Sequence, residues 1–262
     1  MADAPGASVV PGAVTDPVSP ASLLFVSCVS DWSVARERLL ASPCLQPGAR
    51  PLVLRGNACS AAEAVNAVLD GRPHERWLVW LHQDVYLPAG WDVLFAQRLQ
   101  EATLRWPHLA VAGVYGVRGA GADAVRAGRV LDRGRLLHEP AALPCLVDSL
   151  DELLLAVRCD AGLRLDPALG FDFYATDLVL QAQAAGLAAA ALDACCEHWS
   201  GTPAQGAVHD RLVQRITASA AVFEHKWRQR LPLTTPCFAI AAPGDTAAFL
   251  EWARRLPSAP QA

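Results

Sequence analysis

Short, wholly apolar runs alternate with longer segments of helical periodicity over residues 22–117, and this alternation constrains the fold more than any other feature. The run WLVWL at residues 77–81 is apolar at every position, which is typical of a strand buried on both faces of a parallel sheet. The helical segments carry start and stop signals, such as Ser60 and Glu63 at capping-box spacing ahead of Gly71. The pattern predicts βαβ units in an α/β fold, with a mostly parallel sheet and helices on both faces.

The expected elements can be placed along the chain. Strands are predicted at residues 22–30, 50–57, 77–81 and 109–117, and helices at residues 31–42, 60–71 and 90–106. The apolar stripe expected on the last of these helices consists of Val93, Leu94, Leu99 and Leu104. Residues 118–140, rich in Gly, Arg and Asp, predict a mobile loop or a small hairpin. Further on we expect a strand or edge pair at 145–158, a helix at 171–187, a strand at 189–202, and helices at 206–231 and 245–256.

The chain divides into three segments by composition. Residues 1–20 are rich in Ala, Pro, Gly and Val without any period, which predicts a disordered tail. Residues 21–205 carry the α/β pattern and are expected to form one domain. Residues 206–262 are expected to form a C-terminal helical extension that packs on the same domain.

Charge and cysteine content exclude several classes of protein. The net charge is -4 and no basic run or stripe appears, so we expect no nucleic-acid partner. We see no apolar stretch long enough for a transmembrane segment and no secretory signal at the start. The eight cysteines include no C-x-x-C pair, which favours a reduced, cytoplasmic protein whose thiols are mostly buried.

Polar side chains that could carry chemistry follow the predicted strands. His82 and Asp84 come directly after the run at 77–81, where ligands bind in open parallel sheets, and their spacing of two points both to one face. Such a pair suits a divalent cation, Mn²⁺ or Mg²⁺, although a polar strand end with a satisfied histidine fits about equally well. Asp177 near a helix start is more often a capping acid, and a lone His198 is more often a packing residue. Arginines of the 118–140 segment are weaker candidates for phosphate contacts: Arg118, Arg126 and Arg129.

Six blocks of sequence occur together in a characteristic order: NACSAAEAVNAVLD, WLVWLHQDVYLPAGW, VAGVYGV, LDELLLAVR, FDFYATDLVLQAQAAGL and CEHWSG. In this order they resemble the family-2-like glycosyltransferases of the GT-A (Rossmann-like) fold, in particular the group named for the StrF domain of streptomycin biosynthesis. The resemblance covers about residues 22–202, and the H-Q-D-V and F-x-x-Y-x-T-D blocks are its most specific parts. It implies an inverting transfer of a sugar from a nucleoside-diphosphate sugar to an acceptor hydroxyl, assisted by a divalent cation.

The resemblance also implies roles for particular residues. Asp84 would replace the last acid of the family's D-x-D motif and bind the cation that carries the diphosphate, while His82 occupies the place of the first acid. Asp177 would be the catalytic base. His198 would be a late metal or diphosphate contact. Asn57 and Ser60 stand near the position where the nucleoside is read. The acceptor, whether glycan, protein or small molecule, is left open.

Two other functions fit the same residues. The histidine at position 82, where the family has an acid, is compatible with a catalytically inactive GT-A protein that binds a nucleotide sugar or a partner. An unrelated metal-dependent hydrolase using Asp84 is the third hypothesis.

Overall fold

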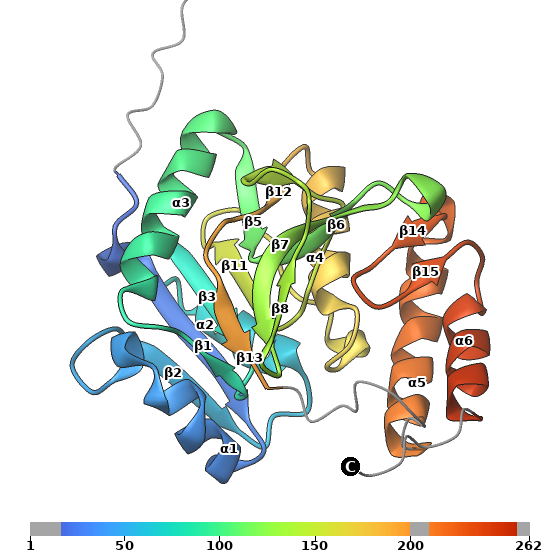
Figure 1. The fold of residues 1–262 in the computed structure, drawn as a ribbon, viewed down its shortest axis with the longest axis horizontal. Coiled ribbons are helices and arrows are strands. Elements are labelled where there is room, and N and C mark those ends of the chain that lie inside the picture. Colours follow the sequence, from blue (N-terminus) through green and yellow to red (C-terminus); the bar gives the residue numbers. More distant parts are fainter. Residues whose placement is uncertain (1–16, 200–209, 256–262) are drawn as a thin grey trace, which may run out of the picture.

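Two β-sheets form the middle of the molecule, and helices cover the larger sheet on both faces (Figure 1). We describe residues 17–199 and 210–255 from a computed structural model. Most of the predicted tail, residues 1–16, lies outside the described residues. Val18 is buried, and its backbone N–H donates to Gln100 on α3 (Trp91–Arg105), so the last residues assigned to the tail pack on the domain.

The larger sheet has seven strands in the order β2-β1-β3-β11-β5-β12-β9. Their bounds are β1 Leu23–Val29, β2 Leu52–Gly56, β3 Trp77–Leu81, β5 Leu109–Gly113, β9 Cys145–Leu146, β11 Leu154–Arg158 and β12 Ala188–Ala191. Strands β2, β1 and β3 are parallel, as is the pair β5 and β12, but β11 runs antiparallel to both of its neighbours and β9 to β12. The sheet is therefore mixed, and the prediction of a mostly parallel sheet is wrong.

The direction of β11 follows from its connection. Between β5 and β11 the chain forms four strands of the smaller sheet and the edge strand β9, and it then returns beside β5 without the crossover helix that a parallel neighbour requires. Because β11 is buried in the middle of the sheet, its apolar run looks the same in either direction.

The smaller sheet contains the segments in which the sequence pattern broke. It has the order β10-β6-β7-β13-β4, with β8 paired to β7. The bounds are β4 Val85–Tyr86, β6 Tyr115–Arg118, β7 Val125–Asp132, β8 Arg135–His138, β10 Ser149–Leu150 and β13 Cys196–His198. Strands β7 and β8 form the hairpin that was one of the two interpretations of residues 118–140, and Arg133 and Gly134 at its turn have the positive φ values that tight hairpins need. The predicted strands 109–117 and 189–202 each divide between the two sheets.

Alternate residues of the larger sheet face different helices. Phe25 and Val79 pack with α3 on one face, while Val26 and Trp80 pack with the helices α2 (Ala61–Asp70) and α4 (Tyr174–Ala184) on the other. The short α1 (Trp32–Glu37) follows β1 and is capped by Asp31.

The apolar stripe expected on α3 is wrong for most of its residues. Val93 and Leu104 are 55% and 68% exposed, whereas Phe95 and Leu99 are buried. Trp91 stacks on Phe95 with ring centroids 4.5 Å apart, and this aromatic pair turns a different face of the helix toward the sheet.

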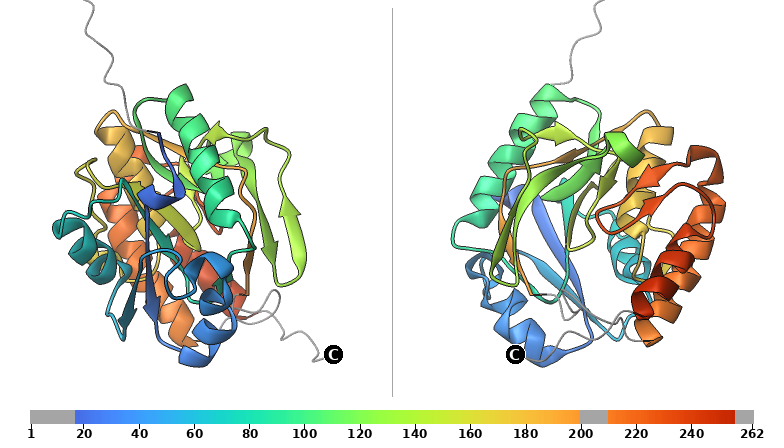
Figure 2. Two further views of the ribbon diagram at one scale, coloured as in Figure 1. Left: turned by 90° about the vertical axis from the view of Figure 1, so that its left-hand side faces the viewer. Right: turned by 45° about the vertical axis from the view of Figure 1, so that its right-hand side comes forward.

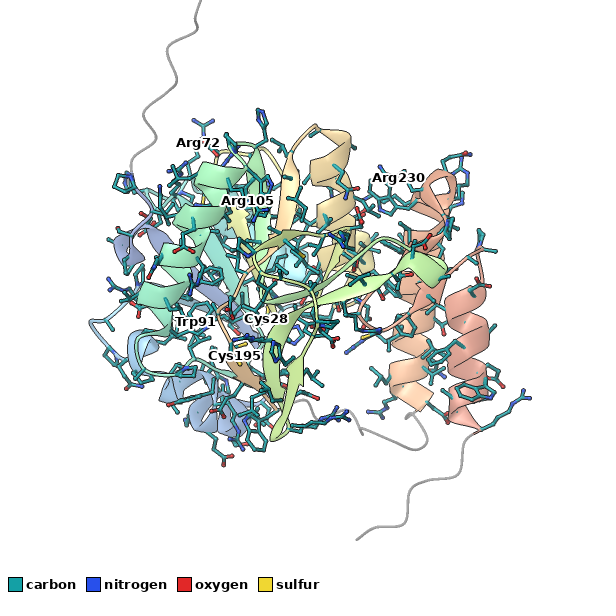
Figure 3. The ribbon with its side chains drawn as sticks, turned by 45° about the horizontal axis from the view of Figure 1, so that its top comes forward. Cys28, Arg72, Trp91, Arg105, Cys195 and Arg230 are labelled. Carbon is teal, nitrogen blue, oxygen red and sulfur yellow. The ribbon has the colours of Figure 1, made fainter. Side chains whose placement is uncertain are left out.

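The C-terminal segment forms the helices α5 (Asp210–Lys226) and α6 (Asp245–Arg254), with the small pair β14 (Leu233–Thr234) and β15 (Ala239–Ile240) between them. The two helices lie side by side at the end of the molecule away from α1 and β2 (Figures 1 and 2). Arg230, labelled in Figure 3, donates to Gln183 of α4 and ties this segment to the domain. None of the described helices is long and apolar enough to cross a membrane.

Candidate metal centre and adjoining pocket

His82, Asp84 and His198 meet where the two sheets approach each other, and one ligand atom from each lies within 4.8 Å of the others. His82 and Asp84 follow the carboxyl end of β3. His198 ends β13, and its register places it opposite Val85 on one side and Asp132 on the other. The sheet pairing thus brings His198 to His82 and Asp84, although more than a hundred residues of sequence separate it from them.

The hydrogen bonds of His82 fix which of its nitrogens is free. Its Nε2 lies 2.8 Å from the hydroxyl oxygen of Tyr174. That hydroxyl donates its one proton to the backbone carbonyl of Glu152, so it must accept a proton from His82 Nε2 as it does from Trp80 Nε1. Burial lowers the pKa of His82 and keeps the ring neutral. The remaining nitrogen, Nδ1, therefore carries an available lone pair, as a metal ligand needs.

His198 is oriented in a comparable way by a carboxylate. Its Nδ1 lies 3.0 Å from Asp132 Oδ1, so Nδ1–H donates to this carboxylate, and in the neutral ring this tautomer has its lone pair on Nε2. The Nε2 atom faces Asp84 Oδ1 at 3.6 Å, a separation too long for a hydrogen bond. Two ligand atoms that share one ion at about 2.1 Å lie roughly 3.0–3.4 Å apart, so a small movement would suit a shared cation.

Asp84 supplies the clearest sign that a cation belongs here. Its Oδ1 is buried and has no hydrogen-bond partner within the described parts of the chain. Buried carboxylate oxygens are nearly always paired, and a divalent cation between Asp84 and the two imidazoles would pair this one. Because two of the three ligands are nitrogens, the site fits Mn²⁺ better than Mg²⁺, which prefers an all-oxygen set.

A pocket of about 340 Å³ opens beside these three residues. It lies at the carboxyl ends of the parallel strands β1, β2 and β3, where open sheets bind their ligands. Cys28, labelled in Figure 3, marks the end of β1 in the middle of the molecule. The lining residues are Cys28, Val29, Ser30, Asn57, Ala58, Trp80, His82, Gln83, Asp84, Phe171 and Arg215.

The two residues predicted to lie near the nucleoside have different positions. Asn57 lines the pocket at the end of β2 and adopts a positive φ of 54°. Ser60 is buried and caps α2: its Oγ accepts the backbone N–H of Glu63 at 3.1 Å, and Glu63 in turn accepts the N–H of Cys59. The structure therefore shows Ser60 as a helix cap, and its nucleotide contact stays a prediction.

Asp177 is not brought together with the other predicted site residues. It is fully buried, and it is not among the described residues that line the pocket. Its carboxylate accepts from Trp227 Nε1 at 2.7 Å and Gln181 Nε2 at 2.6 Å, and pairs with Lys226 Nζ at 2.8 Å. These donors occupy both oxygens in the structure, so its role as catalytic base stays a prediction without support from the geometry.

Sequence reasoning missed two residues of the site and the role of a third. Tyr174 lies in the F-x-x-Y-x-T-D block and is a candidate for stacking on a sugar from its residue type, but in the structure its hydroxyl orients His82. Asp132 orients His198 from the hairpin turn, a segment we expected only as a loop or hairpin. Arg215 lines the pocket from the amphipathic helix α5, where nothing in the sequence distinguishes it. None of the arginines proposed from residues 118–140 is among the described lining residues; Arg126 instead donates to the backbone of Pro236.

One part of the chain is similar to a curated protein sequence. No protein-family model matches the chain. A curated relative from Fuscovulum blasticum, described as ATP synthase subunits region ORF 6, is 32% identical in an alignment of 167 residues that covers 58% of this chain. The match spans 61% of that relative, so the chain covers about three fifths of its length.

Solved structures identify the fold. The chain is similar to the mannosyltransferase PcManGT from Pyrobaculum calidifontis, solved in complex with GDP-Man and Mn²⁺. The TM-score is 0.50 at 13% identity, over 90% of this chain and 73% of that one. GalNAc-T7, solved with UDP, GalNAc and Mn²⁺, gives a TM-score of 0.45 at 11% identity, over 90% of this chain and 55% of that one. The chain thus has a fold similar to that of the GT-A glycosyltransferases.

Proposed function

We propose that the protein is an inverting glycosyltransferase that moves a sugar from a nucleoside-diphosphate sugar to an acceptor hydroxyl with the help of a divalent cation. The observation that carries this proposal is the cluster of His82, Asp84 and His198 at the edge of a strand-end pocket, with a buried carboxylate oxygen of Asp84 that accepts no hydrogen bond from the described residues. The GT-A-like fold and the order of the sequence blocks support the same function, and the blocks support a StrF-type enzyme within that fold.

The chemistry of the site suits a nucleoside diphosphate as leaving group. When bound, the cation supplies positive charge where the diphosphate gains negative charge as the glycosidic bond breaks. His82, Asp84 and His198 would hold it, with Tyr174 and Asp132 keeping the two imidazoles in the required tautomers. We propose Mn²⁺ as the physiological ion because of the two nitrogen ligands.

The other lining residues suit the organic parts of a donor. Asn57 can donate and accept hydrogen bonds at the end of β2, where we propose that the nucleoside is read. Trp80 and Phe171 supply aromatic surface to the same pocket. All eight cysteines are free thiols, which supports our proposal that the enzyme works in the reducing cytoplasm.

A thermal-shift panel of UDP, GDP, dTDP and CDP, each with and without Mn²⁺, tests the proposal. We expect at least one nucleotide to raise the melting temperature only when Mn²⁺ is present, and Asp84→Asn to abolish this shift. If none of the four shifts the wild-type protein in the presence of Mn²⁺, the proposed function is wrong.

The inactive binding protein is the alternative that this panel does not separate. Incubating the protein with the matching nucleotide sugars and Mn²⁺ makes the distinction. An enzyme releases nucleoside diphosphate, with sugar passed to an added acceptor or to water, whereas a binding protein releases none above the level of the Asp84→Asn variant.

A further inference from the structure

One guanidinium group reaches the pocket from outside the α/β domain. Arg215 belongs to α5, in the C-terminal segment, and it is the only Arg or Lys among the described residues that line the pocket. Its side chain is 52% exposed, so it retains access to solvent and to a ligand. A permanent positive charge therefore stands beside the cluster that we propose binds a cation.

A buried carboxylate fixes the orientation of this guanidinium. Arg215 Nε and Nη2 donate to the two oxygens of Asp172 at 3.0 Å and 2.9 Å, and the hydroxyl of Ser219 donates to the same carboxylate at 3.3 Å. Asp172 is 7% exposed. Two of the five N–H groups of the arginine are used in this fork, so three remain for a ligand.

The position of Arg215 relative to the metal cluster suits a ligand that spans both. Asp172 directly follows Phe171, which lines the same pocket. Arg215, His82 and Asp84 all line this pocket.

We propose that Arg215 binds the diphosphate of the donor and is a catalytic residue of the transfer, an inference that rests on the proposed function. In the transfer the bond between the sugar's anomeric carbon and the diphosphate oxygen breaks, and its electron pair stays on that oxygen. The acceptor oxygen bonds to the same carbon and loses its proton to a base. Arg215 stabilises the charge on the departing diphosphate, because a planar guanidinium matches two phosphate oxygens at once.

Binding measurements on Arg215→Gln test this inference. Inorganic pyrophosphate serves as a probe without a nucleobase, and UDP, GDP, dTDP and CDP serve as fragments of the donor. In the presence of Mn²⁺ we expect the variant to bind them about 10- to 100-fold more weakly, the loss typical of a charge-assisted hydrogen bond. Binding of the nucleoside alone should not change. Arg211→Gln, an exposed arginine one turn earlier on α5, is the matched control and should bind as the wild type does.

Arg215→Lys keeps the positive charge but cannot donate two parallel hydrogen bonds as the guanidinium does. It replaces Arg215→Gln in these measurements if that variant does not fold. We expect an intermediate weakening, and a kcat for transfer that falls more than KM rises, since the contact strengthens as charge develops. Diphosphate binding equal to wild type in a folded Arg215 variant would overturn this inference and leave the proposed function standing. Weakened nucleoside binding would overturn it as well. A wild-type protein that binds no nucleoside diphosphate would overturn both.

Discussion

Replacing Asp177 with Asn separates two roles for this residue, the catalytic base implied by its sequence block and the structural anchor seen in the fold. The variant has nearly the same shape but no charge. In the asparagine an NH₂ group, which donates hydrogen bonds, replaces one of the carboxylate oxygens. In the wild type both oxygens of Asp177 accept from donors: Trp227 and Lys226 at Oδ1, Gln181 at Oδ2. The amide therefore loses at least one hydrogen bond and leaves Lys226 with one carboxylate partner in place of two.

The size of the effect follows from these contacts. Breaking a buried ion pair costs about 3–5 kcal/mol, and we take the lower end, about 3 kcal/mol, because Lys226 stays paired with Asp166 and is 31% exposed. In a chain of this length each kcal/mol lowers the melting temperature by about 2–4 °C, so a drop of roughly 6–12 °C is expected. Urea unfolding gives the free energy, and thermal melting gives an independent estimate.

Asp166→Asn is the matched control. It removes the other carboxylate that pairs with Lys226. Because the side chain of Asp166 is 24% exposed, the substitution should lower the free energy of unfolding by only about 1 kcal/mol. Nucleoside-diphosphate binding of the folded Asp177→Asn variant should equal wild type. Our reasoning is refuted if Asp177→Asn melts within about 2 °C of the wild type and yet abolishes transfer, the behaviour of a base rather than an anchor.

Three other predictions concern the metal cluster and the neighbouring helix. Mn²⁺ should raise the melting temperature more than Mg²⁺ at equal concentration, and equal stabilisation by the two ions would count against the nitrogen ligands. Metal-free Asp84→Asn should be no less stable than metal-free wild type, since it removes a carboxylate whose buried Oδ1 accepts no hydrogen bond from the described residues. Because burial lowers the pKa of His82 in the folded protein, the unfolded chain binds a proton at this histidine at a higher pH than the folded protein does. The free energy of unfolding should therefore decrease as the pH falls below about 6.5, by at most about 1.4 kcal/mol per pH unit. The difference in unfolding free energy between metal-free wild type and His82→Asn should then vary with pH between 7 and 5.5, and a constant difference would contradict the assignment. Ser60→Ala should lower stability by about 1 kcal/mol through loss of the α2 cap and leave nucleotide binding unchanged, which the same thermal-shift panel measures.

The sequence was informative where a short-range pattern decides the structure. The apolar runs place β1, β2 and β3, and the capping signals place the start of α2, because each depends on neighbours within a few residues. His82 and Asp84 were found from their position after β3 alone. Their partner His198 was suggested by the family resemblance, while its closeness depends on the pairing of β13 with β4 and β7.

What the sequence could not predict depends on long-range packing. The direction of β11 is set by a detour of the chain through a second sheet. The buried face of α3 is set by the stacking of Trp91 on Phe95 rather than by the count of apolar residues. The position of Arg215 depends on how α5 docks against Asp172, and local composition carries no trace of that contact.

The helix α5 also determines where the chain can be truncated without loss of folding. Arg215, Lys226 and Trp227 provide partners to Asp172 and Asp177, which are nearly or fully buried in the preceding α/β domain. A chain cut before α5 would expose apolar surface and remove the donors that Arg215, Lys226 and Trp227 provide to these two interior carboxylates. We therefore expect the C-terminal helices and the larger sheet to melt in one cooperative transition, and a fragment that ends near residue 205 not to fold.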